Sequence, residues 1–387
     1  MLQKIKEAHA NKFKDKVLYV KAPSRVNLIG EHTDYNLGFS LPAAVNLAMY
    51  FAMNENNEQF INLQAYNLQQ SVSFENGDRS YPQGHWIGLF KTVLIELEAR
   101  GFKVNGIDCT FGGDIPIGAG MSSSSALNCG FIFSLSQIYN WKLSAKDIML
   151  IAQAAEHRFG VKGGLMDQYT ILNGKKNHAL LLDFLQMKHQ FIPLNMGDFR
   201  FVLFNTCVKH SLVDSPYNQR RKSCENALEI IKEKHAEIHS YQDLTEDILL
   251  EFKSEIALED FRKARYVIKE NKRVLEAAVA LKTSDWEGFG QLLFESHQGL
   301  REEYEVSCPE LDFIVDTVRG QAGVLGSRMM GGGFGGCTIN LIHKDKIESV
   351  WEYLSKAYFD EFQIQAEIYE VEVGGGIHEC GNGKVEK

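Results

Sequence analysis

The chain has 387 residues, 44% of them hydrophobic, and a formal net charge of −9 at pH 7. This length and composition predict a globular protein with a sizeable core divided between two domains. Lysine and arginine are scattered rather than gathered in a stripe, so we expect no nucleic-acid partner. Neither a secretory leader nor a run of about 18 apolar residues is present, so we expect a cytoplasmic protein without a membrane partner. We also expect a monomer.

The seven cysteines are an odd number and are widely spaced along the chain. They form neither a C-x-x-C pair nor a Cys/His cluster with the spacing of a zinc site. We therefore expect reduced thiols in the core or near the surface, without a nucleophilic role.

Strand patterns fill the first quarter of the chain. Segments that alternate, or turn apolar as a buried strand does, are 16–30, 41–54, 61–74 and 104–116. Apolar residues at helical spacing predict a helix that begins near Trp86 and stops at Gly101, and a second helix over 126–139. Ser144 and Asp147 have the spacing of a capping box, which predicts that a third helix begins there.

The second half is expected to be richer in helix. Strand patterns occur at 178–184 and 199–206, whereas residues from about 217 to 300 carry several charged amphipathic helices. Because strands and helices neither alternate strictly nor segregate, the sequence predicts two α+β domains, which we place at 1–180 and 181–387.

A serine-rich loop, GAGMSSSSAL at 118–127, follows a predicted strand and opens an apolar helix. Two glycines let the backbone approach a ligand, the serine hydroxyls add donors, and the free N–H groups of the helix attract an anion. The loop is neither a Walker loop nor a Rossmann fingerprint. We interpret it as a phosphate site, with a serine-rich cap on an ordinary helix as the alternative.

A dense polar block lies at 25–35, RVNLIGEHTDY, where an apolar strand ends. Closely spaced donors and acceptors can hydrogen-bond several hydroxyls of one sugar, and Glu31, His32 and Asp34 suit that task. The alternative is a solvated turn held by a salt bridge.

Two glycine-rich segments complete the candidate set. In GGLMDQ at 163–168, paired glycines present Asp167, a candidate general base whose ionised form Arg25 would favour; a helix cap is the alternative role for Asp167. Five glycines fall within the six positions 331–336, which indicates close approach of another backbone or a ligand, or else a structural hinge or bulge.

Taken together, APSRVNLIGEHTDYN, PIGAGMSSSSAL and GGGFGGC resemble the three motifs of the GHMP sugar and metabolite kinases, in the order of that family. The first block is similar to that of the galactokinases, and the resemblance spans about residues 10–375. It implies a ribosomal-protein-S5-like N-terminal domain against a C-terminal domain with a ferredoxin-like core, and an active site between them.

The resemblance also implies roles for single residues. Arg25 matches the arginine that stabilises the transferring phosphoryl group, and Asp167 matches the base toward the anomeric hydroxyl of the sugar. Ser124 and Glu156 match the pair that holds Mg²⁺ with the nucleotide phosphates. The other expected contacts are Glu31, His32, Thr33, Asp34, Gly164 and Tyr217 for the sugar, and Gly118, Ala119, Gly120, Met121, Ser122, Ser123, Ser124 and Trp86 for ATP.

The chain departs from the family pattern at three places. Ser24 stands where the family usually has glycine, Met121 replaces the usual leucine, and the stretch between Glu156 and Asp167 is one residue short. No chemical group is lost, but the shorter stretch could shift Asp167 relative to the metal, and a misplacement near 1 Å can cost about a hundredfold in rate.

The resemblance implies an ATP-dependent sugar 1-kinase that converts D-galactose to galactose 1-phosphate in the Leloir pathway, with Mg²⁺ as cofactor and the sugar and ATP as its small-molecule partners. A kinase for N-acetylgalactosamine, arabinose or galacturonate is one alternative, and a silent sensor of galactose and ATP is another. The complete serine loop, with Arg25 and Asp167 both present, favours an active enzyme.

Overall fold

The computed structural model describes residues 1–13, 16–56, 58–116, 118–160, 162–208 and 217–381. Its helices are α1 Leu2–Ala10, α2 Ile87–Ala99, α3 Ser123–Ile138, α4 Ala145–Phe159, α5 Met166–Asn173, α6 Tyr217–Lys234, α7 Glu246–Glu251, α8 Leu258–Thr283, α9 Trp286–Gly299, α10 Pro309–Val318 and α11 Ile347–Phe362. Its strands are β1 Leu18–Asn27, β2 Phe39–Ser40, β3 Pro42–Glu55, β4 Phe60–Ala65, β5 Gln70–Glu75, β6 Ile107–Gly113, β7 His178–Asp183, β8 Lys188–Pro193, β9 Phe199–Asn205, β10 Val324–Met329, β11 Cys337–His343, β12 Glu367–Val371 and β13 His378–Glu379.

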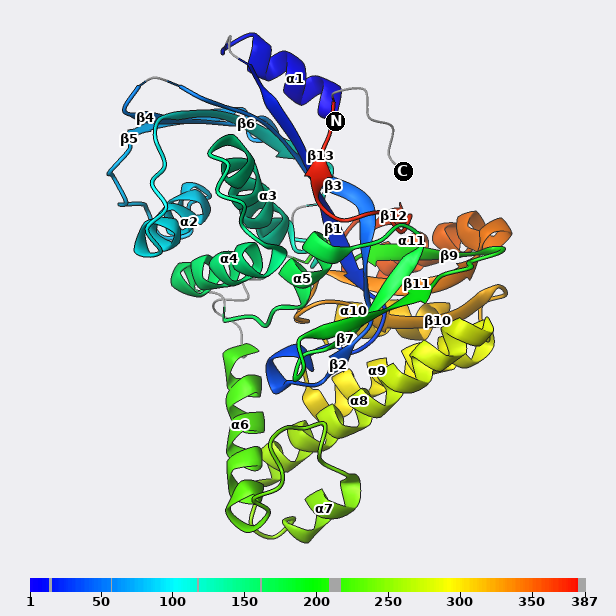
Figure 1. Cartoon of the computed structure of the whole chain (residues 1–387). Coiled ribbons are helices and arrows are strands. Elements are labelled where there is room, and N and C mark those ends of the chain that lie inside the picture. The colour runs from blue at the N-terminus through cyan, green and yellow to red at the C-terminus, as the bar shows by residue number, and fades with distance from the viewer. Residues whose placement is uncertain (14–15, 57, 117, 161, 209–216, 382–387) are drawn as a thin grey trace.

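The first sheet carries the site-bearing strand β1. Its order within the described residues is β13-β1-β3-β6-β4-β5, and its pairs are antiparallel apart from β4 with β6. Helices α2, α3 and α4 cover one face, and α1 covers the other (Figure 1). At Gly130 of α3 a Cβ would lie 2.2 Å from the ring of Phe51 in β3, so the glycine allows this helix to pack closely on the sheet.

The second sheet has the strand order of a ferredoxin-like fold. Within the described residues it runs β10-β11-β9-β12, all antiparallel, with helices between β9 and β10 and between β11 and β12. Alternation along β9 decides the packing: Phe201 and Leu203 face the core shared with α9, whereas Val202 and Phe204 face α10 and α11. The order agrees with the expected ferredoxin-like core.

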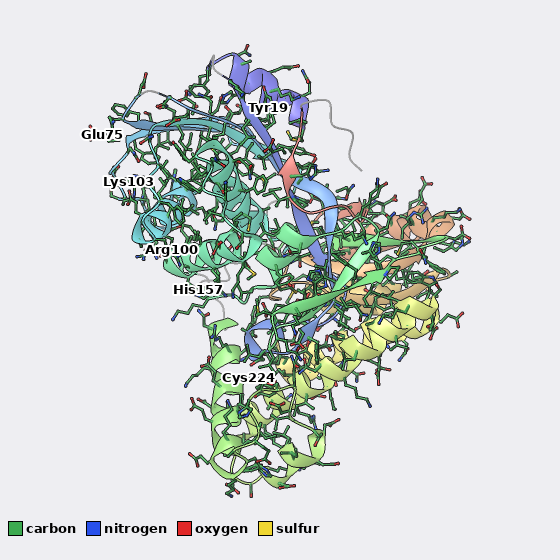
Figure 2. All side chains as sticks on the ribbon, in the orientation of Figure 1. Tyr19, Glu75, Arg100, Lys103, His157 and Cys224 are labelled. Carbon is green, nitrogen blue, oxygen red and sulfur yellow. The ribbon has the colours of Figure 1, made fainter. Side chains whose placement is uncertain are left out.

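Helices α6 and α7 and the first part of α8 form an arm (Figure 1). Its apolar core also includes residues from outside the arm, namely Leu300, Tyr304, Val306, Leu311 and Met329. Cys224 of α6 is buried in that core, and Figure 2 places it in the arm below the two sheets. The long helix α8 then continues out of the arm to pack against α9 and the third sheet, β2-β7-β8.

A single apolar cluster joins the first sheet to one face of the second. The domain boundary that the sequence analysis places between residues 180 and 181 stays a prediction. In the structure this position lies within β7. Among the described residues, no helix is long and apolar enough to cross a membrane, and the seven cysteines are free thiols.

Most of the predicted elements are confirmed, but the strand predicted over 61–74 is wrong. These residues form a hairpin, β4 and β5, whose connection includes a turn with Gln69 at a φ of 52°. The side-chain amide of Asn67 in this turn bonds both backbone groups of Gly113, at 2.8 and 2.9 Å. Apolar residues alternate on both sides of the turn, but their phase changes between Ala65 and Tyr66. The single-strand prediction overlooked this change of phase.

The capping box that begins α4 gives a test of local stability. Ser144 Oγ accepts from the N–H of Asp147 at 3.2 Å, while the Asp147 carboxylate accepts from the N–H of Ser144 at 2.9 Å. Ser144→Ala should lower the free energy of unfolding by about 1 kcal/mol, measured in urea. Ser355→Ala, within α11, caps no helix and should change it by less than about 0.5 kcal/mol; equal losses would contradict the capping role.

Candidate active site

A cavity of about 210 Å³ lies where the end of β1, the beginnings of α3 and α5, and the 331–336 loop meet. It gathers residues from all the sequence blocks identified above. The predicted residues that line it are Arg25, Glu31, His32, Asp34, Gly118, Ala119, Gly120, Met121, Ser122, Ser123, Ser124, Glu156, Gly164 and Asp167.

Arg25 and Asp167, which both line this cavity, form an ion pair. Arg25 is 4% exposed, and its Nε donates to Oδ1 of Asp167 at 2.6 Å. Its Nη1 donates to the carbonyl of Gly120 at 2.8 Å, so one guanidinium holds both the carboxylate and the serine loop. The register of β1 against β3 shifts between Pro23 and Arg25, an irregularity of the kind that re-aims side chains near active sites.

Asp167 does not cap a helix. It lies in the first turn of α5 behind Leu165, which occupies the N-cap position without a side-chain cap bond. Its second oxygen, Oδ2, accepts a hydrogen bond from the hydroxyl of Ser122. The cap interpretation of Asp167 is therefore wrong, and both carboxylate oxygens are oriented by the site.

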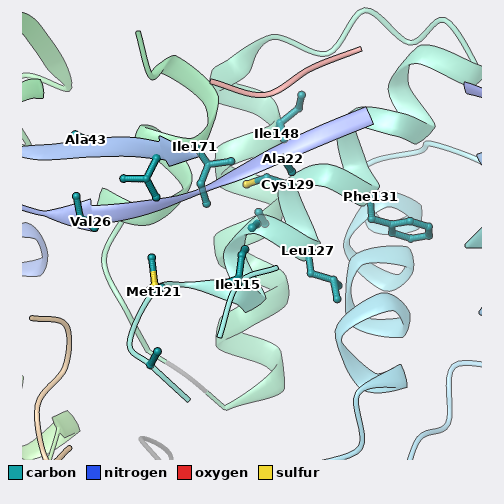
Figure 3. Packing of buried hydrophobic residues seen from close by; sticks show 14 of the residues in the cluster. Ala22, Val26, Ala43, Ile115, Met121, Leu127, Cys129, Phe131, Ile148 and Ile171 are labelled. Carbon is teal, nitrogen blue, oxygen red and sulfur yellow. The ribbon is translucent and has the colours of Figure 1, made fainter. Parts of the chain in front are cut away.

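The serine loop adopts a backbone that suits close approach of an anion. Gly118, Gly120 and Ser122 all have positive φ, at 79°, 69° and 57°. Two of the departures from the family pattern meet here, because the hydroxyl of Ser24 donates to the carbonyl of Met121 at 2.6 Å. The Met121 side chain is buried and points toward β1, near Val26 (Figure 3). Ser24 and Met121 therefore both connect the serine loop to β1.

Glu156 is buried beside the loop with both carboxylate oxygens bonded. Oε1 accepts from the hydroxyl of Ser125 at 2.6 Å, and Oε2 accepts from Nε2 of Gln168 at 2.7 Å. Burial raises the pKa of Glu156 to about 7, and the charge of Asp167 acts in the same direction. Ser124 also lines the cavity, but the serine that contacts Glu156 is Ser125, which the sequence analysis did not single out.

The polar block after β1 is buried rather than a solvated turn, so that alternative is wrong. Oε1 of Glu31 accepts from the N–H of Gly331 at 2.8 Å and from Nη2 of the fully buried Arg328 at 3.2 Å. Burial lowers the pKa of His32 to about 3, so its imidazole is neutral, and Nδ1 lies 2.7 Å from the hydroxyl of Tyr35.

Asp34 and Thr33 differ in placement. Burial raises the pKa of Asp34 to about 6, with a further contribution from the charge of Asp167. Thr33 does not line the cavity; its hydroxyl bonds to the carbonyls of Gly30 and Phe39 at 2.9 and 2.6 Å, which fixes the turn that presents its neighbours.

Two glycines explain how the blocks come so close together. A Cβ on Gly164 would lie 1.9 Å from Oδ2 of Asp34, so the absence of a side chain at this position leaves room for the Asp34 carboxylate. In the 331–336 loop, a Cβ on Gly331 would lie 3.2 Å from the carbonyl oxygen of Gly120. The backbone-approach interpretation of this loop is confirmed, and Gly331 and Gly332 line the cavity as well.

A second cavity of about 320 Å³ adjoins the first and shares Ser123 and Ser124 with it. It is mainly apolar, and Trp86 lies in its wall with Nε1 donating to Oε1 of Gln70 at 2.8 Å. The sequence analysis missed its other lining residues, because they come from separate elements: Met49, Ala65, Tyr66, Asn67, Leu68, Leu89, Phe111, Gly112, Gly113, Ile115 and Leu127. Tyr217 is the first residue of α6, and its side chain lies outside the described part of the structure.

The oxygen donors beside the serine loop fit a divalent cation bound together with phosphate. No group of three or more His, Cys, Asp or Glu side chains gathers as a metal site within the described residues. Mg²⁺ commonly uses one or two carboxylates, with phosphates and water completing its shell. Glu156 and the hydroxyls at the start of α3 provide oxygen ligands of this kind. Gln168 lines the same cavity, and its buried Oε1 has no hydrogen-bond partner among the described residues.

Comparison with known proteins identifies the family. The chain matches the galactokinase galactose-binding signature over residues 7–55, the GHMP kinase N-terminal domain over 88–175 and the GHMP kinase C-terminal domain over 277–360. It is 38% identical to the curated galactokinase of Thermotoga neapolitana over 359 residues, 92% of this chain and 99% of that protein. It is 36% identical to the galactokinase of Clostridium perfringens over 385 residues, 97% of this chain and 98% of that protein.

The chain belongs to the galactokinases. The crystal structure of Lactococcus lactis galactokinase complexed with galactose matches it with a TM-score of 0.91 and 29% identity, over 98% of this chain and 100% of that one. Methanococcus jannaschii mevalonate kinase, at 20% identity and a TM-score of 0.67 over 94% of this chain and 100% of its own, shares the fold. The α+β GHMP kinase fold expected from the sequence is thus confirmed.

For this galactokinase, Gly164→Ala should lower kcat/KM for the sugar by about a hundredfold while leaving ATP affinity nearly unchanged. The added Cβ would displace Asp34, and a shift near 1 Å in a positioned group costs about this much. Gly163→Ala is the matched control because a Cβ there meets nothing within 4 Å. Steady-state kinetics of both variants test the contact, and equal losses would refute it.

The pKa of Asp34 gives a pH prediction. Because the ionised carboxylate is the better acceptor for sugar hydroxyls and its pKa in the free protein is about 6, sugar affinity should fall as the pH drops below about 6. The loss should approach about tenfold per pH unit, measured by calorimetry between about pH 5 and pH 7.5. Asp34→Asn should flatten the profile. A wild-type profile that is level across this range would count against the assignment.

Proposed function

We propose that the chain phosphorylates D-galactose at its anomeric hydroxyl with ATP, giving galactose 1-phosphate and ADP. The observation that carries this proposal is the Arg25–Asp167 ion pair at 2.6 Å, which lies in one cavity with both the serine loop and the polar block after β1. Phosphoryl transfer needs chiefly alignment and charge neutralisation, which is what this arrangement provides.

The two adjoining cavities support separate places for the two substrates. The apolar cavity with Trp86 suits a flat adenine ring, and Ser123 and Ser124 connect it to the first cavity. The serine loop and the N–H groups at the start of α3 suit the phosphates. We assign the sugar to Glu31, His32, Asp34, Gly164 and, by family resemblance, Tyr217.

In the proposed mechanism, Asp167 accepts the proton of the anomeric hydroxyl as that oxygen bonds to the γ-phosphorus. The bond from the γ-phosphorus to the oxygen bridging it to the β-phosphate breaks, and ADP leaves. The two carboxylate oxygens of Asp167 are held by Arg25 and by the hydroxyl of Ser122, so this side chain is fixed in position to accept the proton as the new bond forms. The Arg25 guanidinium has five donors, and the contacts with Asp167 and Gly120 leave others for the oxygens of the transferring group.

Mg²⁺ bound with the nucleotide would neutralise charge on the phosphate oxygens. We propose that Glu156 and the hydroxyls at the start of α3 hold it, with Ser124 the hydroxyl favoured by resemblance and Ser125 the one in contact with Glu156.

Release of ADP from purified protein, measured against galactose, N-acetylgalactosamine, arabinose and galacturonate, tests the substrate. Galactose should give the highest kcat/KM. A preference for another sugar would replace the proposed substrate, and binding of galactose and ATP without turnover would indicate a sensor.

Asp167→Asn tests the role of the base. It preserves the size of the side chain but removes the proton acceptor, so kcat should fall by about 10² to 10⁴, with a much smaller change in sugar affinity. Single-turnover kinetics together with calorimetric sugar binding separate the two effects. Equal losses in binding and turnover would contradict the assignment of Asp167 as the base.

A further inference from the structure

Gln168, which follows Asp167 on the first turn of α5, links the two carboxylates of the site. Its side chain is buried, with the residue 1% exposed, and lines the cavity. Nε2 donates to Oε2 of Glu156 at 2.7 Å, opposite the bond from Ser125 to Oε1. A carboxylate held on both oxygens has a fixed plane, so Gln168 decides how Glu156 faces the serine loop.

The oxygen of the Gln168 side-chain amide differs from its nitrogen in hydrogen bonding. Oε1 of Gln168 is buried and has no hydrogen-bond partner among the described residues. An unpaired buried acceptor costs about 1–3 kcal/mol, so a native site normally supplies a partner. Both amide atoms of Asn128 on α3 are also buried without a partner in the described residues, but Asn128 does not line this cavity. Gln168 does line it, so a ligand bound in the cavity can supply the partner that Oε1 lacks.

We propose that Gln168 is a positioning residue for the divalent cation: its N–H fixes the Glu156 carboxylate, and its Oε1 accepts a hydrogen bond from a water molecule bound to the metal. Mg²⁺ usually keeps several waters, and partners of this kind orient the ligands that bind a metal directly. This inference rests on the proposed function, because it takes Glu156 as a ligand of the cation that accompanies ATP.

The test uses Mn²⁺ in place of Mg²⁺, with ATP and without sugar, and follows free Mn²⁺ by electron paramagnetic resonance. Gln168→Met removes both the donor and the acceptor at similar volume, and should weaken Mn²⁺ binding to the ATP complex by about 10- to 100-fold. The affinity for galactose should change by less than about threefold, since Glu31, His32 and Asp34 are untouched. Gln64→Met on β4, where Gln64 accepts from Thr110 at 3.1 Å, is the matched control and should bind Mn²⁺ normally.

Two further variants separate positioning from a general loss of structure. Gln168→Asn keeps an amide but is one methylene too short for the 2.7 Å contact, so it should show the same loss of Mn²⁺ affinity, and it serves if the methionine variant fails to fold. In the background of Glu156→Gln, the effect of Gln168→Met should shrink, because much of that effect acts through Glu156.

The outcomes distinguish this inference from the function on which it rests. If the wild-type protein binds Mn²⁺ and ATP but folded Gln168→Met or Gln168→Asn binds them within about threefold of wild type, the positioning role is overturned. Equal losses of Mn²⁺ and galactose affinity would also overturn it, since they indicate general disruption. If the wild-type protein binds neither ATP nor Mn²⁺ with ATP, the proposed function itself fails.

Discussion

The ion pair between Arg25 and Asp167 is the interaction on which the rest of the site depends. It joins the end of β1 to the first turn of α5, and the same guanidinium bonds to Gly120 in the serine loop. Three segments far apart in the sequence are therefore fixed by one side chain that is almost fully buried. Removing one member of such a pair leaves the other buried without its partner, which is more damaging than the loss of a surface contact.

The second constraint is close contact between the two halves of the chain, which side chains larger than glycine would prevent. Gly331 lies against the backbone of Gly120, and its N–H bonds to Glu31. Arg328, on β10, reaches the carbonyls of Asn27 and Leu28 at the end of β1. The turn that we propose to bind the sugar is thus supported by the ferredoxin-like sheet, so the proposed sugar site is not formed by the first sheet alone.

Local chemistry explains what the sequence could predict. Long apolar strands such as β3, the capping box at Ser144 and the glycine-serine loop have signals contained in a few neighbouring residues. Contacts between elements have no such signal: the serine that bonds to Glu156 depends on how α3 is rotated, and in the structure it is Ser125. The resemblance named Ser124 as a contact of the metal, which stays a prediction. Likewise, the contact of Gln168 with Glu156 forms only because α4 and α5 lie side by side, which no local sequence signal predicts.

Charge balance connects these observations. Four carboxylates line the first cavity, on Glu31, Asp34, Glu156 and Asp167, whereas Arg25 is the one lysine or arginine among its described lining residues. Burial raises the pKa of Asp34 and of Glu156, and the charge of Asp167 acts in the same direction on both. Free ATP would add still more negative charge to that space. In the proposed function, a divalent cation that enters with the nucleotide offsets the negative charge of the carboxylates and of ATP. Orienting Glu156 toward the serine loop places a carboxylate where that cation binds.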